Sequence, residues 1–206
     1  RKNNFKVYIP EFSTLSQSFK ESSHFFFSRA AVSLYTSGNT FVLGVFVSNT
    51  MIGYYSIAEK LYIALQALYM PVINVLYPYI AKERNIKLFK KIFKLAMVFN
   101  YCLICGLYFM APYLVELISG NEIVESMEVF RIFLVVSIIV VPSMLIGYPF
   151  LAALGYKNYA NYSVVIAAFV HIAGLLILAF SNHINIYSVA SLLVVTQLID
   201  LLVRVF

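Results

Sequence analysis

Apolar residues dominate the chain in long blocks that are separated by short polar segments. The blocks lie at 24–47, 56–80, 88–111, 129–154, 159–180 and 186–206. A helix rises 1.5 Å per residue, so about 20 apolar residues cross the roughly 30 Å hydrocarbon layer of a bilayer. The blocks are too long and too uniformly apolar for the alternating strands of a membrane barrel. The pattern therefore predicts an all-α, polytopic membrane protein with a bundle of about six transmembrane helices.

Composition supports lipid as the solvent of this chain. Hydrophobic residues make up 62% and charged residues 12%, with a mean hydropathy of +0.85, whereas an ordinary globular domain is roughly 45–50% apolar and 25% charged. The net charge of +6 raises the question of nucleic acid. However, the Lys and Arg residues lie between apolar blocks and form no patch on a globular face, so no nucleic-acid partner is expected.

The distribution of positive charge predicts the topology, because Lys and Arg collect in cytoplasmic loops. The predicted loops 48–55, 112–128 and 181–185 contain no Lys or Arg. The leading segment, the alternate connections and the far end carry Arg1, Lys2, Lys6, Lys20, Lys82, Arg84, Lys87, Lys90, Lys91, Lys94, Lys157 and Arg204. Both ends of the chain are therefore predicted to be cytoplasmic.

The basic segment 82–94 has an amphipathic pattern. Ile86, Phe89, Ile92 and Phe93 share one helical face, with lysines opposite. This pattern predicts a helix that lies at the headgroup level before the chain turns into the membrane. Anchoring of the next span and binding of anionic lipid both fit this pattern.

Polar residues inside the first predicted span recur at helical spacing. Arg29, Ser33, Thr36 and Thr40 share one face, and Asn39 is adjacent to it. Such a face is expected to look at protein or water because intramembrane polar groups are costly. Two interpretations of Arg29, near the start of this span, remain open. It either extends to the cytoplasmic headgroups or lends positive potential to a cavity for an anionic substrate.

The second predicted span carries a comparable stripe. One helical face carries Glu59, Tyr62, Gln66 and Tyr69, and Lys60 directly follows Glu59. Glu59 and Lys60 form an ion pair that fixes neighbouring helices, or they serve transport, with Lys60 in a cationic cavity and Glu59 as a proton carrier.

The later spans contain further ionisable groups. His171 is either a proton relay or a neutral imidazole that a neighbouring hydroxyl satisfies. Asp200 and Arg204 are four residues apart, which predicts a structural ion pair on one helix. Amide side chains that are expected to bond between helices are Asn74, Asn100 and Gln197.

Proline residues interrupt two of the spans. Pro71 and Pro78 fall in the second span, and Pro142, Gly147 and Pro149 in the fourth. Proline lacks the backbone N–H and clashes with the preceding turn, so these helices are predicted to bend. Broken helices are common in transporters, although they also occur in other membrane proteins.

The sequence contains no recognisable catalytic, metal or cofactor site. It has no H-E-x-x-H, P-loop or dinucleotide-binding motif. Cys102 and Cys105 have C-x-x-C spacing, but no His or carboxylate lies nearby to complete a metal site. We interpret them as buried thiols that pack as small apolar groups.

Three sequence segments resemble a known family. SLYTSGNT at 33–40, GYYSIAEK at 53–60 and LYPYI at 76–80 are similar to the Wzx-type O-antigen flippases, which belong to the polysaccharide-exporter branch of the multidrug/oligosaccharidyl-lipid/polysaccharide superfamily. The similarity is densest over 29–82. The rest of the chain shares the pattern of hydropathy.

The resemblance implies an architecture of twelve helices in two bundles of six. The chain would then supply a cytoplasmic segment at 1–21 and the second bundle at 22–206, and its partner would be the N-terminal six-helix half. The implied activity is movement of an undecaprenyl-pyrophosphate-linked oligosaccharide across the bacterial inner membrane by alternating access, coupled to an ion gradient. Implied partners are this lipid-linked oligosaccharide, membrane lipids and other polysaccharide-assembly proteins.

The cation-lined cavity of the family maps onto Arg29 and Lys60. The hydroxyl and amide groups that would extend this polar path are those of Ser33, Thr36, Asn39, Thr40 and Gln66. Glu59 and His171 are the candidates for ion coupling.

Three other functions remain open. A cation-coupled multidrug exporter would need an acidic cavity, whereas the first two spans carry more positive than negative charge. A membrane enzyme such as a polymerase would need a large outer loop or an intramembrane catalytic cluster. A structural subunit without transport activity is the third.

Overall fold

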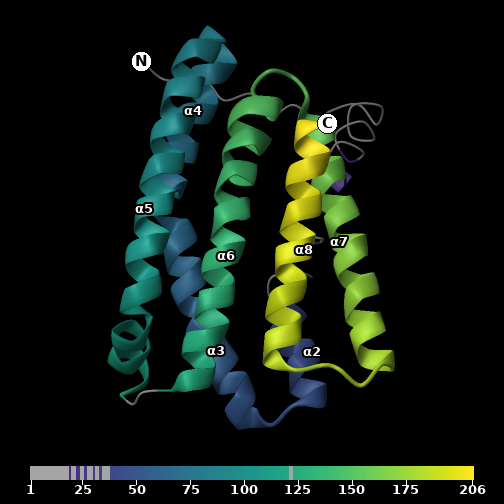
Figure 1. The fold of residues 1–206 in the computed structure, drawn as a ribbon. Helices are drawn as coiled ribbons and strands as arrows, with labels where there is room; N and C mark the ends of the chain where they lie inside the picture. Colours follow the sequence, from purple (N-terminus) through teal and green to yellow (C-terminus); the bar gives the residue numbers. More distant parts are fainter. Residues whose placement is uncertain are drawn as a thin grey trace, which may run out of the picture.

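The computed structural model describes residues 38–120 and 123–206, together with Phe19, Ser22, Ser23, Phe26, Ala30 and Ser33. Helices that run side by side make up the described part of the chain (Figure 1). The elements are α2 (Gly38–Phe46), α3 (Asn49–Ala67), α4 (Met70–Glu83), α5 (Ile86–Ser119), α6 (Val124–Ile146), the π-helix η1 (Gly147–Ala152), α7 (Lys157–Phe180) and α8 (Ile186–Val205).

Five of the described helical segments are long and apolar enough to cross a membrane. They are Asn49–Glu83, Ile86–Ser119, Val124–Ala152, Lys157–Phe180 and Ile186–Val205. The prediction of an all-α polytopic membrane bundle is thereby confirmed. Of the span predicted at 24–47, the structure describes α2 and three isolated residues, and the predicted segment 1–21 lies outside the described residues apart from Phe19.

Two connections are shorter than predicted. The chain needs only Val47 and Ser48 between α2 and α3, because the Ser48 side chain caps α3 by accepting from the Met51 N–H. α5 continues through Pro112 to Ser119 and ends where Gly120 adopts a left-handed conformation, with φ of 72°. The expected loops 48–55 and 112–128 are therefore wrong in extent.

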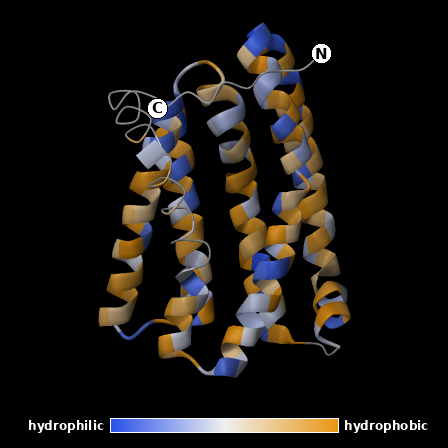
Figure 2. Cartoon of the chain, turned by 180° about the vertical axis from the view of Figure 1, so that it is seen from behind, coloured by the Kyte–Doolittle hydropathy of each residue, from blue (hydrophilic) through white to orange (hydrophobic). Residues whose placement is uncertain are grey.

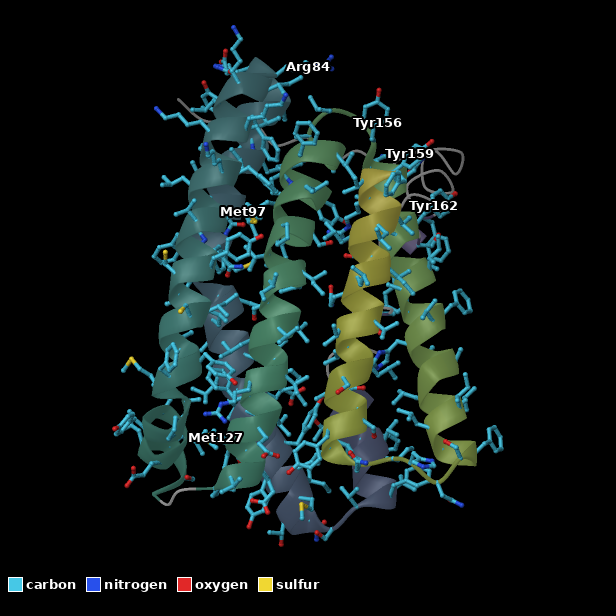
Figure 3. All side chains as sticks on the ribbon, in the orientation of Figure 1. Arg84, Met97, Met127, Tyr156, Tyr159 and Tyr162 are labelled. Atoms are coloured by element: carbon cyan, nitrogen blue, oxygen red, sulfur yellow. The ribbon has the colours of Figure 1, made fainter. Side chains whose placement is uncertain are left out.

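The basic segment 82–94 also differs from its prediction. α4 ends at Glu83, Arg84 (labelled in Figure 3) turns the chain with φ of 49°, and Asn85 caps α5 by accepting from the Leu88 N–H. α5 is then continuous for 34 residues. At 1.5 Å per residue this is about 51 Å, longer than the roughly 30 Å hydrocarbon layer. The lysines thus lie on the projecting first turns of α5, and no separate surface helix forms.

Helix breaks are present near Pro71 and Pro149, whereas α4 continues through Pro78 and α6 continues through Pro142. The second span divides between α3 and α4 at Leu68 and Tyr69, and Pro71 is the second residue of α4. In the fourth span Pro142 lies inside α6, and Pro149 lies in η1, where the α-helical pattern gives way to a π-helix. Proline accounts for both interruptions because it cannot donate the backbone hydrogen bond.

α6 forms the centre of the core. It lies between α5 and α8 in Figure 1 and packs against α3, α5 and α8. The buried Phe133 of α6 stacks on Tyr62 with a centroid distance of 4.9 Å and meets the edge of Tyr55 at 5.5 Å. These tyrosines are packing residues of the core.

The connections fall at two opposite ends of the bundle (Figures 1 and 2). One end carries the α4–α5 and α6–α7 connections and the C-terminus of α8, and we call it the basic end. The other end carries the α2–α3, α5–α6 and α7–α8 connections, and we call it the opposite end. This arrangement agrees with the alternation of charge predicted from the sequence.

A buried ionic network joins three helices near the basic end. Arg204 Nη2 lies 3.2 Å from Asp200 Oδ2, so the predicted pair is confirmed. Ser143 of α6 donates to Asp200 Oδ2 at 2.6 Å, and Arg204 donates from Nε to Ser163 Oγ of α7 at 2.9 Å and from Nη1 to the Ser143 carbonyl. A Cβ atom at Gly147 would lie 2.6 Å from Arg204 Nη1, so only glycine leaves room for the guanidinium.

We predict that Gly147→Ala lowers the free energy of unfolding by about 2 kcal/mol, because the added methyl displaces Arg204 and disturbs a buried charged network. The measurement is the thermal unfolding midpoint of the purified protein in detergent. Gly106→Ala is the matched control, since a Cβ there meets nothing within 4 Å. A Gly147 variant as stable as the Gly106 variant would contradict the prediction.

Candidate functional site

A buried histidine connects three helices in the half of the bundle nearer the opposite end. His171 of α7 is fully buried. Its Nε2 lies 2.7 Å from Asn39 Oδ1 of α2, and its Nδ1 lies 2.8 Å from Thr196 Oγ1 of α8. The expected hydroxyl partner is present, and the amide of Asn39 is a second partner.

The hydrogen bonds around this ring suit two protonation states. Thr196 donates its hydroxyl proton to the Leu192 carbonyl at 2.8 Å and therefore accepts from Nδ1–H. With Asn39 Oδ1 toward Nε2, both ring nitrogens face acceptors, as a protonated imidazolium requires. Rotation of the Asn39 amide presents its N–H₂ group to Nε2 instead, and the ring is then satisfied while neutral.

A second contact joins α2 to α3. Thr40 donates to Glu59 Oε2 at 3.1 Å. Tyr55, one turn before Glu59 on α3, is fully buried, and its hydroxyl lies near Asn39 and Glu59. Two successive residues of α2 thus contact the candidate ion carriers: Asn39 contacts His171, and Thr40 contacts Glu59. We call the group of Asn39, Thr40, Glu59, His171 and Thr196 the α2 polar cluster.

Lys60 does not join this cluster. Its side chain is exposed, and among the described residues the ion pairs are Lys82–Glu83 and Asp200–Arg204. The predicted Glu59–Lys60 ion pair is therefore absent from the described part of the chain, because neighbouring helical residues project about 100° apart. Lys60 faces away from the packed side of α3.

The other candidates are scattered. Gln66 is half-buried, seven residues beyond Glu59 on α3, and Ser33 is exposed. Arg29 and Thr36 lie outside the described residues. The structure thus brings together Asn39, Thr40, Glu59 and His171 and leaves the remaining predictions untested.

A separate buried contact stabilises the break in the second span. Tyr69 donates to Asn100 Oδ1 of α5 at 2.8 Å, and Asn100 donates to the Ser137 carbonyl of α6 at 3.2 Å. Asn100 therefore bonds between helices, as predicted. Asn74 is exposed, whereas Gln197 is buried.

The prediction of buried thiols is wrong. Cys102 and Cys105 are both free and exposed on α5, which borders the bundle in Figure 1. Exposure of thiols costs little where the surroundings are lipid. Within 38–120 and 123–206, no group of three or more His, Cys, Asp or Glu residues is arranged to hold a metal ion.

Arg131 is an intramembrane cation that the sequence interpretation missed. It lies on α6, inside the span predicted at 129–154, and its guanidinium carbon is 4.9 Å from the ring centroid of Tyr108 on α5. A charged residue within an apolar block was the available signal. Its position close to the acidic segment 116–128, seven residues into α6, makes it look like part of a connection in the sequence.

Comparison with known proteins gives two matches. Residues 1–83 match the family described as "Polysaccharide biosynthesis protein". A Shigella dysenteriae protein described as "Putative O-antigen transporter" is 29% identical over 126 residues, which are 59% of this chain and 32% of that protein. The chain spans about a third of the length of this curated relative. No solved structure matches the chain.

The fold defines the class as a multi-pass helical membrane protein. Both matches support the resemblance found in the sequence, since the chain is similar to a family of polysaccharide biosynthesis proteins and to a protein described as an O-antigen transporter.

We predict that His171→Phe destabilises the bundle, because it leaves the polar groups of Asn39 and Thr196 buried without their ring partner. Loss of a buried hydrogen-bond partner costs about 1–3 kcal/mol. The thermal unfolding midpoint in detergent measures the effect. His183→Phe, in the exposed α7–α8 connection, is the control, and an equal effect of the two substitutions would show that the buried hydrogen bonds contribute nothing.

Proposed function

We propose that this chain is part of a flippase that moves undecaprenyl-pyrophosphate-linked oligosaccharide across the bacterial inner membrane. The observation that carries the proposal is the α2 polar cluster, which lies inside an apolar bundle of a chain similar to a protein described as an O-antigen transporter. Together with an N-terminal half of similar architecture, the bundle would form one side of an alternating-access transporter.

The chemistry of the cargo requires such a polar path. A pyrophosphate and its sugars cannot cross hydrocarbon unaided, whereas the lipid tail can remain in the bilayer. α2 and α3 offer hydroxyl, amide and charged side chains along the bundle, among them Thr40, Lys60 and Gln66. In this proposal Arg29, Ser33 and Thr36 contribute to the same path, and Arg29 attracts the anionic head group.

Glu59 and His171 are the proposed ion-coupling residues. Ionisable groups inside a membrane are expensive and commonly serve ion or proton pathways. Each of them is hydrogen-bonded to α2, through Thr40 and Asn39 respectively. A change in the charge of either group alters a bond to α2. Protonation would thereby change the position of the helix that borders the path.

We further propose that the basic end faces the cytoplasm. The connections at that end carry the lysines and arginines, and positive residues are retained on the cytoplasmic side.

A multidrug exporter would instead require a predominantly acidic cavity.

Deletion of the full-length gene is expected to abolish surface polysaccharide and to cause lipid-linked repeat units to accumulate on the cytoplasmic side. Restoring the gene with Glu59→Gln or His171→Gln should reduce surface polysaccharide at least tenfold, because a neutral amide cannot carry a proton. Both changes keep hydrogen-bonding capacity. Surface polysaccharide is measured by gel analysis, and the leaflet of the precursor by accessibility to an added glycosyl-cleaving enzyme.

Glu116→Gln and His183→Gln are the matched controls, because both side chains are exposed near the opposite end. Full surface polysaccharide in the Glu59 and His171 variants would remove the ion-coupling assignment while leaving transport intact. Unchanged polysaccharide after deletion, with altered drug tolerance, would instead establish the exporter function.

Arg29→Ala in the full-length protein is expected to abolish surface polysaccharide without loss of the protein from the membrane, because the path loses its positive potential for the pyrophosphate. Arg29→Lys keeps the charge and should be partly tolerated. The checks are surface polysaccharide and membrane protein level. Wild-type behaviour of Arg29→Ala would show that the cationic-cavity assignment is wrong for this residue.

A further inference from the structure

Arg131 occupies an unusual position for a cation in this bundle. It is seven residues from Val124, the first residue of α6, so it lies about 10 Å along the helix from the opposite end. The α2–α3 and α7–α8 connections at that end contain no Lys or Arg. Arg131 therefore stands where the charge pattern of the chain disfavours a cation, and its position calls for an anionic counterpart.

The described residues supply no carboxylate for it. The nearest acid on α6 is Glu128, which is directed toward Tyr187 of α8, and the ion pairs of the described residues do not include Arg131. The Nε atom of Arg131 is buried and makes no hydrogen bond there. The ring of Tyr108 contacts the guanidinium through its face, and this contact leaves the terminal Nη groups at the edge of the guanidinium plane available for an acceptor.

The surroundings specify the kind of anion. Tyr108 is 45% exposed and its ring lies 5.8 Å from that of Phe109, and further exposed apolar side chains on the same two helices are Tyr101 of α5 and Val135 and Ile138 of α6. In a membrane this surface contacts acyl chains. An anion that reaches Arg131 along it must carry hydrocarbon of its own, and the phosphate of a lipid does so while matching the bidentate geometry of a guanidinium.

We propose that Arg131 and Tyr108 form a binding site for the phosphate group of a membrane lipid, in the leaflet at the opposite end of the bundle. Arg131 donates to the phosphate oxygens, the Tyr108 ring holds the guanidinium in place, and the lipid tails lie along the exposed surface of α5 and α6. This site is separate from the α2 polar cluster and does not depend on the proposed transport function.

The absence of Trp from the chain allows a direct test. Tyr108→Trp introduces a single fluorescent indole at the site and retains a ring suited to the cation–π contact. The chain is reconstituted in phosphate-free bilayers of digalactosyl diacylglycerol, and phosphatidylglycerol with brominated chains is titrated in as the quencher. Adding Arg131→Gln should raise the mole fraction for half-maximal quenching about tenfold, since a charge-assisted contact is lost.

Two controls distinguish the site from general attraction of anionic lipid. Lys157→Gln removes one positive charge at the basic end and should leave half-maximal quenching unchanged. Brominated digalactosyl diacylglycerol lacks phosphate and should quench the proteins with and without Arg131 equally. Equal titrations by phosphatidylglycerol with and without Arg131 would overturn the proposal.

A further arm identifies the source of the phosphate. Undecaprenyl pyrophosphate added at about one molecule per protein relieves the quenching if the site prefers the carrier lipid, and leaves it unchanged if a phospholipid is the occupant. Native mass spectrometry of the unmodified chain and of Arg131→Gln provides an independent measurement. Loss of one retained phosphatidylglycerol in the variant supports the site, and identical lipid occupancy refutes it.

Discussion

The arrangement of the helices depends on the requirement that polar groups in hydrocarbon find partners inside the protein, because lipid offers no hydrogen bonds. Apolar packing alone discriminates weakly between helix faces, since acyl chains are as apolar as leucine. Here three buried polar groups join different helices. His171 connects α7 to α2 and α8, Asn100 connects α5 to α4 and α6, and Arg204 connects α8 to α6 and α7. These contacts define which faces meet.

The fold class was predictable because the length of an apolar block is set by the thickness of a bilayer. The residues at which the helices begin and end were harder to predict. Ser48 begins α3 through a capping hydrogen bond, and Gly120 ends α5 by adopting a left-handed backbone conformation. These local effects outweigh the polarity of the sequence from which the loops had been inferred. The segment 82–94 likewise has the pattern of a surface helix, yet its amphipathic turns continue into α5 without interruption.

The sequence predicted the types of residue in the candidate site better than it predicted which of these residues contact one another. Helical spacing identified Thr40 and Glu59 as members of polar stripes, and their contact follows from the packing of successive spans. The partnership of Asn39 with His171 joins positions 132 residues apart, and periodicity within one span carries no information about it. Cys102 and Cys105 show a related difficulty, because an apolar sequence looks the same whether a side chain faces protein or lipid.

The close approach of Arg204 to Gly147 has an evolutionary consequence. Arg204 and Ser143 both contact Oδ2 of Asp200, and the missing side chain at Gly147 leaves the space that the guanidinium occupies. Loss of Arg204 alone leaves Asp200 buried without its cation, and replacement of Gly147 alone produces a clash, so either single change is costly. Positions 147, 200 and 204 are therefore expected to vary together among related sequences.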